Sequence, residues 1–198
     1  MKSTKRTELT TPDLVLLSLL AERPMHGYQA NAELERRCVR DWAAISRPQI
    51  YYSLEKLARA GLIDSADSEE PAAGPERQKY ETTVKGRAAL AAALEKEDWT
   101  TQRERPAFLT WMALSWQARP GAFAEQLARR KKFLEREIAR EKTTLDAVMT
   151  EVGHAYHEAV WMITLMIEQF ETEVRWLKKV EREIQKRGKA KRPAYAEK

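Results

Sequence analysis

The pattern of apolar and polar positions predicts short, closely spaced elements in the first half of the chain. Residues 14–20 are almost all apolar, which predicts a helix buried on most sides. A second helix is expected from about Gly27 to Val39, with Tyr28, Leu34 and Cys38 as buried positions. Together with a third helix beginning near residue 46, this pattern predicts a three-helix N-terminal unit.

The third helix has the clearest start signal. Its beginning reads Ser46-Arg47-Pro48-Gln49, in which serine and glutamine form a capping-box pattern and proline lies in the first turn. A period of 3.6 residues places Ile50, Leu54, Leu57 and Ala58 on one face and Pro48, Gln49, Tyr52, Lys56 and Arg59 on the opposite face. Gly61 then ends the helix. We therefore expect an amphipathic helix whose polar face is open.

A β-hairpin is predicted after the third helix. Residues 62–65 form a short strand, residues 66–76 an acidic loop with proline and glycine, and residues 77–82 the returning strand. Arg77 and Lys79 place basic groups on the returning strand, and Thr82 or Thr83 caps a fourth helix. Three helices and a two-stranded wing are typical of a winged helix-turn-helix, which inserts its third helix into the major groove of DNA.

The second half of the chain predicts long helices. A helix opening at Pro106 runs through Trp116, and two long helices follow. The last helix carries apolar residues in alternating steps of four and three, the spacing of a coiled-coil seam. We expect dimerisation through this seam, whose members are Tyr156, Val160, Ile163, Ile167, Phe170, Val174 and Leu177. A second stripe, Trp161, Leu165, Trp176 and Val180, lies beside it. One stripe can meet the other long helix of the same chain, and the other stripe can meet a partner chain.

The expected fold class is mainly α in three parts. Residues 10–98 form the winged-helix domain with its two-stranded wing, residues 106–186 the long-helix, coiled-coil-like dimerisation domain, and residues 187–198 a basic flexible tail. The net charge of +5 is concentrated away from the winged helix, since residues 1–90 carry 14 basic and 13 acidic side chains. Local placement must therefore carry any argument for DNA binding. A single cysteine excludes an intramolecular disulfide and suits a reducing cytoplasm.

Candidate DNA-contacting side chains gather on the third helix, its start and the wing. The set is Tyr28, Ser46, Arg47, Pro48, Gln49, Tyr51, Tyr52, Lys56, Arg77 and Lys79. The N-terminal residues of a recognition helix reach base edges, whereas basic wing residues follow the phosphates. The sequence contains no Gly-rich phosphate loop, nucleophile elbow, zinc-finger spacing or acid pair, so no catalytic residues, cofactor or metal are expected. His154 and His157 lie one turn apart, but a third metal ligand is not apparent.

Several segments resemble the PadR-like family of regulators. They are Leu16-Leu17-Ser18-Leu19-Leu20, Met25-His26-Gly27-Tyr28, residues 46–57, Gly61-Leu62-Ile63 and residues 80–87. The C-terminal part, with Arg175-Trp176-Leu177, resembles the larger subfamily with a helical Vir-type domain. The resemblance implies a homodimeric repressor, sometimes an activator, and in some members release of DNA on binding phenolic acids or other aromatic compounds. Tyr52 and the acidic pair Glu69-Glu70 depart from the family's pattern.

The tryptophans suggest an effector site between the two domains. Its candidate residues are Trp99, Trp111, Trp116 and Trp161, although aromatic side chains also fill cores and dimer interfaces. The sequence thus predicts a homodimer that binds a palindromic operator in double-stranded DNA, acts as a repressor and is relieved by a small aromatic ligand. The alternative is a winged helix that binds proteins, with the coiled coil as the partner site.

Overall fold

The chain folds into two compact units, residues 1–103 and 104–198. The computed structural model describes residues 8–66, 78–119 and 121–187.

The N-terminal unit is built from short helices around a small sheet. Its helices are α1 (Thr11–Glu22), α2 (Gly27–Arg36), α3 (Val39–Trp42), α4 (Arg47–Arg59), α5 (Val84–Leu94) and α6 (Asp98–Thr101), and its strands are β1 (Met25–His26), β2 (Ile63–Ser65) and β3 (Lys79–Thr82). The predicted third helix is α4, which begins after the Ser46 cap as expected. This arrangement confirms the mainly helical, winged-helix fold class.

The expected second helix is broken into two. Cys38 adopts a left-handed backbone with φ +50°, and it separates α2 from the one-turn helix α3. A left-handed residue cannot continue a right-handed helix, so the predicted span to Val39 was wrong. Cys38 and Tyr28, both expected in the core, are exposed, whereas Leu34 is buried as predicted.

The sheet has three antiparallel strands in the order β1-β3-β2, one more than the predicted wing hairpin. Ile63 lies opposite Thr82 and Ser65 opposite Tyr80, and Tyr80 in turn lies opposite Met25 on β1. The additional strand is short and precedes α2 directly. It ties the start of α2 to the returning strand of the wing. The wing loop between β2 and β3 lies outside the described residues.

The core of the N-terminal unit joins α1 and α4 to the sheet. Its fully buried side chains include Leu16, Leu17 and Leu20 of α1, Ile50, Leu54 and Leu57 of α4, and Met25, Leu34 and Ile63. The three α4 members belong to the predicted apolar face. Burying each such side chain contributes roughly 1.5–3 kcal/mol, so this face holds α4 against the unit and leaves its polar face outward.

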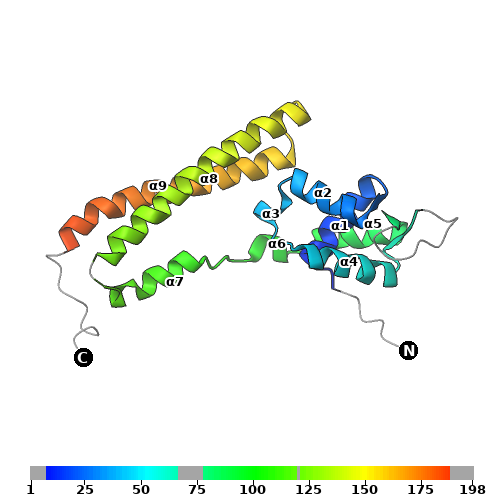
Figure 1. Cartoon of the computed structure of the whole chain (residues 1–198), viewed down its shortest axis with the longest axis horizontal. Coiled ribbons are helices and arrows are strands. Elements are labelled where there is room, and N and C mark those ends of the chain that lie inside the picture. Colours follow the sequence, from blue (N-terminus) through cyan, green and yellow to red (C-terminus); the bar gives the residue numbers. More distant parts are fainter. Residues whose placement is uncertain (1–7, 67–77, 120, 188–198) are drawn as a thin grey trace. The chain divides into compact units, whose positions relative to one another are not determined.

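The C-terminal unit is a helical hairpin with a shorter helix packed on it. Its elements are α7 (Ala107–Leu114), the short 3-10 helix η1 (Ser115–Gln117), α8 (Ala122–Val152) and α9 (Glu158–Arg187). Helices α8 and α9 run side by side in opposite directions (Figure 1). Three ion pairs cross between them: Arg130–Glu173, Lys131–Glu181 and Lys142–Glu171.

The predicted coiled-coil seam is occupied within the chain. Val160, Ile163, Ile167, Val174 and Leu177 are buried, and Val174 and Leu177 cluster with Leu127 and Leu134 of α8. Phe170 packs against the same cluster, whereas Tyr156 precedes α9 and is exposed. In this conformation the buried members of the seam are not available to a second chain. No described helix is long and apolar enough to cross a membrane.

Candidate nucleic-acid interface

The N-terminal turn of α4 presents an open polar surface. The side-chain oxygen Oε1 of Gln49 accepts hydrogen bonds from the Ser46 backbone N–H at 2.8 Å and from the Ser46 hydroxyl at 2.9 Å, so the predicted capping box forms. Pro48 and Gln49 remain exposed. The side chain of Tyr52 is 67% exposed one turn further on. This turn therefore combines a formed cap with exposed side chains able to reach a nucleic acid.

Arg47 adds a cation at the start of α4. Its guanidinium lies 3.8 Å from the Glu35 carboxylate and its side chain is largely exposed. An exposed ion pair of this length is worth little, so it would not hold the guanidinium away from a phosphate.

The two other tyrosines of the predicted set differ in their surroundings. Tyr28 is exposed at the start of α2 and stacks on His26, with 5.4 Å between ring centroids. Tyr51 packs against the core cluster, and its ring lies 3.1 Å from where a Cβ at Gly27 would be. Tyr28 is thus accessible to a ligand, whereas Tyr51 holds α4 against α2.

Lys56 is the predicted contact whose environment differs most from expectation. Its ammonium donates to the Asp13 carboxylate at 2.6 Å and to the Glu8 backbone carbonyl at 2.9 Å. Asp13 is fully buried, and Lys56 is 20% exposed. Burial raises the pKa of Asp13, but hydrogen bonds from Lys56, Thr10 and Ser53 outweigh it and hold that pKa below its usual range. No pattern in the sequence indicated this ion pair.

On the wing, Lys79 is half-buried on β3, opposite His26 of β1. Arg77, the other predicted wing contact, lies outside the described residues. Lys79 is the described basic position closest to the wing loop in sequence, which suits it to a phosphate contact.

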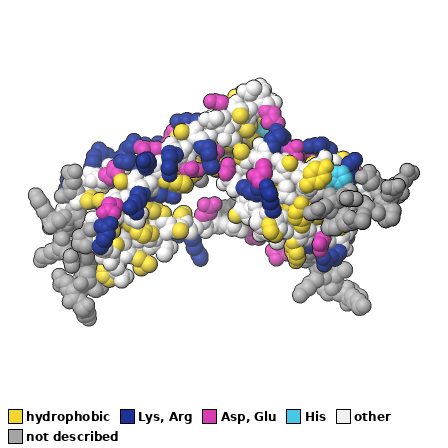
Figure 2. Space-filling view, viewed as in Figure 1, with side chains coloured by type: hydrophobic (Ala, Val, Ile, Leu, Met, Phe, Trp, Pro, Cys, Tyr) yellow, Lys and Arg dark blue, Asp and Glu magenta, His cyan; other side chains and the backbone are white. Residues whose placement is uncertain are grey.

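The C-terminal unit exposes an unusual number of large apolar side chains. On α9, Trp161 is 55% exposed, Leu165 56% and Trp176 41%, and Leu109 and Leu114 of α7 are similarly open. Figure 2 shows hydrophobic side chains open to solvent in the region of α7. The α9 residues belong to the second stripe predicted beside the seam. Apolar stripes of this kind commonly mark an interaction surface.

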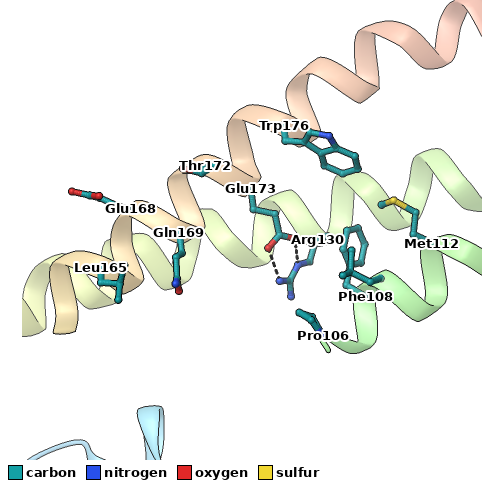
Figure 3. Close-up of a pocket in the computed structure, with 11 residues that line it drawn as sticks. Pro106, Phe108, Met112, Arg130, Leu165, Glu168, Gln169, Thr172, Glu173 and Trp176 are labelled. Carbon is teal, nitrogen blue, oxygen red and sulfur yellow. Dashed lines mark hydrogen bonds and ion pairs between the residues drawn. The ribbon is translucent and has the colours of Figure 1, made fainter. Parts of the chain in front are cut away.

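A groove of about 580 Å³ lies among α7, α8 and α9. Phe108 and Met112 of α7, Leu165 and Trp176 of α9, and Arg130 of α8 line it, as Figure 3 shows. Arg130 forms two hydrogen bonds with Glu173, at 2.8 and 2.9 Å, and its guanidinium lies over the Phe108 ring. The groove is therefore largely apolar, and the charge of Arg130 at its centre is balanced by Glu173.

The four predicted effector tryptophans do not share one environment. Trp111 stacks between Phe108 and Phe123, with centroid distances of 5.3 and 5.6 Å, and so packs the C-terminal unit. Trp116 and Trp161 are exposed in the same unit. Trp99 lies in the N-terminal unit, where its indole N–H donates to the Ala93 carbonyl at 2.8 Å.

Metal-binding geometry is not found among the described residues, where no group of three His, Cys, Asp or Glu side chains could hold an ion. The Nδ1 atoms of His154 and His157 instead accept backbone N–H groups of Tyr156 and Ala159 in the turn between α8 and α9. Both histidines therefore shape the turn.

Residues 16–92 match the model of the transcriptional regulator PadR-like family. This range contains α4, the described wing strands and most of the polar surface described above. Residues 16–92 therefore form a PadR-like domain. The description of this family is that of transcriptional regulators, not of enzymes. No curated protein sequence matches it.

The fold of this PadR-like chain is similar to that of solved bacterial regulators along nearly the whole length of those proteins. PadR of Bacillus subtilis in complex with operator DNA is 16% identical, with a TM-score of 0.73 over 89% of this chain and 99% of that one. A PadR-like regulator of Bacillus cereus is 18% identical, with a TM-score of 0.69 over 89% and 99%. The B. subtilis protein in complex with p-coumaric acid is 19% identical, with a TM-score of 0.61 over 87% and 98%.

Proposed function

We propose that this protein is a sequence-specific, homodimeric DNA-binding regulator of transcription that acts in the cytoplasm as a repressor. The observation that carries the proposal is the open N-terminal half of α4, where Gln49 and Tyr52 face solvent behind a formed capping box. Such a helix fits the major groove, where its N-terminal side chains reach base edges, and the positive end of its dipole favours a nearby phosphate. The similar fold of an operator-bound PadR supports this interpretation. Selecting bound fragments from the source genome tests it.

Gln49 is expected to read a base. The side-chain oxygen of Gln49 accepts the two Ser46 hydrogen bonds, so its amide NH2 is the group that can donate to a base acceptor, and Gln49→Ala should lower the preference for operator over random DNA by about 1 kcal/mol. Lys79→Ala should instead weaken binding to both DNAs by a similar factor, because a phosphate contact carries no sequence information. Fluorescence anisotropy titrations with operator and scrambled duplexes measure both effects.

The cap role of Gln49 needs a separate control, because its side-chain oxygen also closes the capping box with Ser46. Gln49→Glu keeps that acceptor and removes the amide donor. We expect this variant to melt like the wild type and still lose operator preference. Equal losses on both DNAs would reduce Gln49 to a helix cap.

We further propose that the exposed stripe of α9 forms the dimer interface. The stripe reads Glu158, Trp161, Leu165, Glu168, Gln169, Thr172, Trp176 and Lys179, all on the face opposite the buried seam. A two-fold axis between Glu168 and Gln169 would set an antiparallel copy so that Trp161 lies opposite the partner's Trp176. The same axis sets Glu158 opposite the partner's Lys179. This self-complementarity is what an isologous interface requires, and the length of the helices is consistent with the larger, Vir-type subfamily.

A small aromatic ligand is proposed to relieve DNA binding. The exposed Trp116 and Trp161 and the fold shared with a p-coumarate-bound PadR support this. The ligand must bind the conformation that cannot engage DNA more tightly, since equal binding to both conformations shifts nothing.

Titration with p-coumaric acid and related phenolic acids should quench the tryptophan fluorescence and release operator DNA over the same concentration range. In Trp161→Phe or Trp116→Phe, part of the quenching should disappear. Trp111→Phe is the control, because Trp111 is stacked inside the unit. Quenching without any change in operator affinity would contradict the regulatory role.

A further inference from the structure

The start of α1 and the second half of α4 are joined by a buried ion pair. Asp13 is the third residue of α1, and its carboxylate accepts hydrogen bonds from the Thr10 backbone N–H at 2.7 Å and the Thr10 hydroxyl at 2.8 Å. The same oxygen accepts from the Lys56 ammonium at 2.6 Å. A second proton of that ammonium is directed to the Glu8 carbonyl at 2.9 Å. One lysine thus bonds both to the cap of α1 and to the chain that leads into it.

Burial makes this contact specific. Asp13 has no exposed surface, and a buried carboxylate is costly unless it is paired and hydrogen-bonded. The Thr10 groups fix the orientation of the carboxylate, because they belong to the same helical turn as Asp13. The Lys56 ammonium therefore has one well-defined binding position. When Lys56 occupies it, the rotation and position of α4 relative to α1 are set.

Lys56 lies on the same stripe of α4 as the proposed reading residues. Tyr52 is one helical turn before it, and Gln49 is two turns before it. The apolar face of α4 packs against the core from the opposite side. Apolar packing is non-directional, and by itself leaves a helix some freedom to rotate or slide. A charged anchor at the end of the reading stripe removes that freedom.

We propose that Lys56 and Asp13 are positioning residues: their ion pair sets the rotation of α4 on α1 and thereby decides which bases Gln49 and Tyr52 reach. The inference rests on the proposed DNA-binding function. It assigns to Lys56 a role different from the direct contact that its place on the polar face suggests. It assigns a role in DNA discrimination to Asp13, which has no exposed atoms with which to touch DNA.

Salt dependence separates the two roles of Lys56. Loss of a phosphate contact lowers the slope of log K against log salt by about 0.9, and it weakens operator and random DNA alike. Loss of a positioning residue leaves that slope and the affinity for random DNA unchanged. It lowers operator affinity alone, here by about tenfold, the lower range of what one misread base pair costs.

The experiment measures operator and random-DNA affinity at several salt concentrations for the full-length protein, Lys56→Met, Asp13→Asn and the double variant. Both single variants should lose operator preference by about the same factor with an unchanged salt slope, and the double variant should lose no more than either, because the residues act as one unit. Lys85→Met, which removes an exposed lysine bonded to the Ala60 carbonyl, should leave operator preference intact.

Lys56→Arg keeps the charge and tests the idea if Asp13→Asn folds poorly; it should retain most of the operator preference at a melting temperature close to that of the wild type. A lower salt slope in Lys56→Met, with equal losses on both DNAs, would show that Lys56 contacts phosphate and would overturn the inference. Lower melting temperatures with operator preference unchanged would reduce the pair to a stability role and would also overturn it. Wild-type protein that binds no genomic fragment would instead contradict the proposed function.

Discussion

The double variant Trp161→Glu/Trp176→Glu is expected to be a monomer of 22.9 kDa. In the proposed antiparallel arrangement each tryptophan faces the partner's other tryptophan, so the two substitutions remove four rings from one interface. A tryptophan buried in an interface contributes about 2–4 kcal/mol, and facing glutamates add repulsion. The dimer should therefore dissociate at least about 100-fold more readily. Analytical ultracentrifugation across a concentration series measures this directly.

Operator binding provides a second measurement on the same variant. A dimer reads two half-sites one helical turn apart, so a monomer should lose most of its affinity for the full palindrome and keep its affinity for a half-site. Val84→Glu is a control, because Val84 is a highly exposed apolar residue of the N-terminal unit. That variant should remain a dimer. A dimeric Trp161→Glu/Trp176→Glu protein would show that the interface lies elsewhere on the chain.

The proposed dimer surface illustrates what a sequence period can and cannot determine. The spacing from Val160 to Leu177 indicated a helix with an apolar seam, and the structure contains that helix and that seam. The period does not say whether the seam is filled by the same chain or by another one. Here α8 supplies Leu127 and Leu134, and the seam is filled within the chain. The neighbouring stripe was recognised in the sequence as a second surface. Its members Trp161, Leu165 and Trp176 are left open, whereas Val180 packs against the core.

Local signals were the most reliable. The start of α4 was predicted correctly because serine, proline and glutamine act within one turn, and their hydrogen bonds need no distant partner. Strand β1 was missed because Met25 and His26 are too few to show an alternating pattern, and their pairing partners on β3 lie more than fifty residues away. The helix break at Cys38 was not predicted, because the left-handed position there carries neither glycine nor asparagine, the residues that usually mark one.

In the candidate site, too, features that depend on local sequence were predicted, whereas features that depend on tertiary contacts were not. Exposure of Pro48, Gln49 and Tyr52 could be deduced from the helical period alone. The period also put Lys56 on the open face, and only the meeting of α1 with α4 shows where its ammonium goes. Long side chains reach several ångströms away from their own helix, so their partners depend on tertiary structure.

Gly86→Ala is expected to destabilise the N-terminal unit strongly, although helix propensity alone predicts that alanine would stabilise α5. Gly86 lies in the first turn of α5, where its N–H donates to the capping hydroxyl of Thr83 at 3.0 Å. Alanine normally stabilises a helix by about 1 kcal/mol relative to glycine. Here an added Cβ would lie 2.0 Å from the Leu62 carbonyl oxygen and 2.8 Å from the Thr82 methyl group. Neither α5 nor the wing strand can accommodate that contact without moving.

The size of the effect follows from which atoms must move. The Leu62 carbonyl accepts the Thr83 N–H at 3.1 Å, so displacing it disturbs both the end of the wing and the cap of α5. Overpacking of this kind typically costs up to about 3 kcal/mol, which corresponds to a loss of about 10–20 °C in the melting temperature of a domain of this size. Thermal unfolding followed by circular dichroism measures it.

Gly153→Ala is the matched comparison. At Gly86 an added Cβ would collide with neighbouring atoms, whereas at Gly153 the strain would come from the left-handed backbone alone. Gly153 ends α8 with φ +75°, and no atom lies within 4 Å of an added Cβ. Its substitution should cost about 1–2 kcal/mol from the left-handed backbone alone. A Gly86→Ala protein as stable as the wild type would mean that α5 can shift away from Leu62. The wing and α5 would then be a looser assembly than their hydrogen bonds indicate, and the position of Lys79 beside DNA would be correspondingly less fixed.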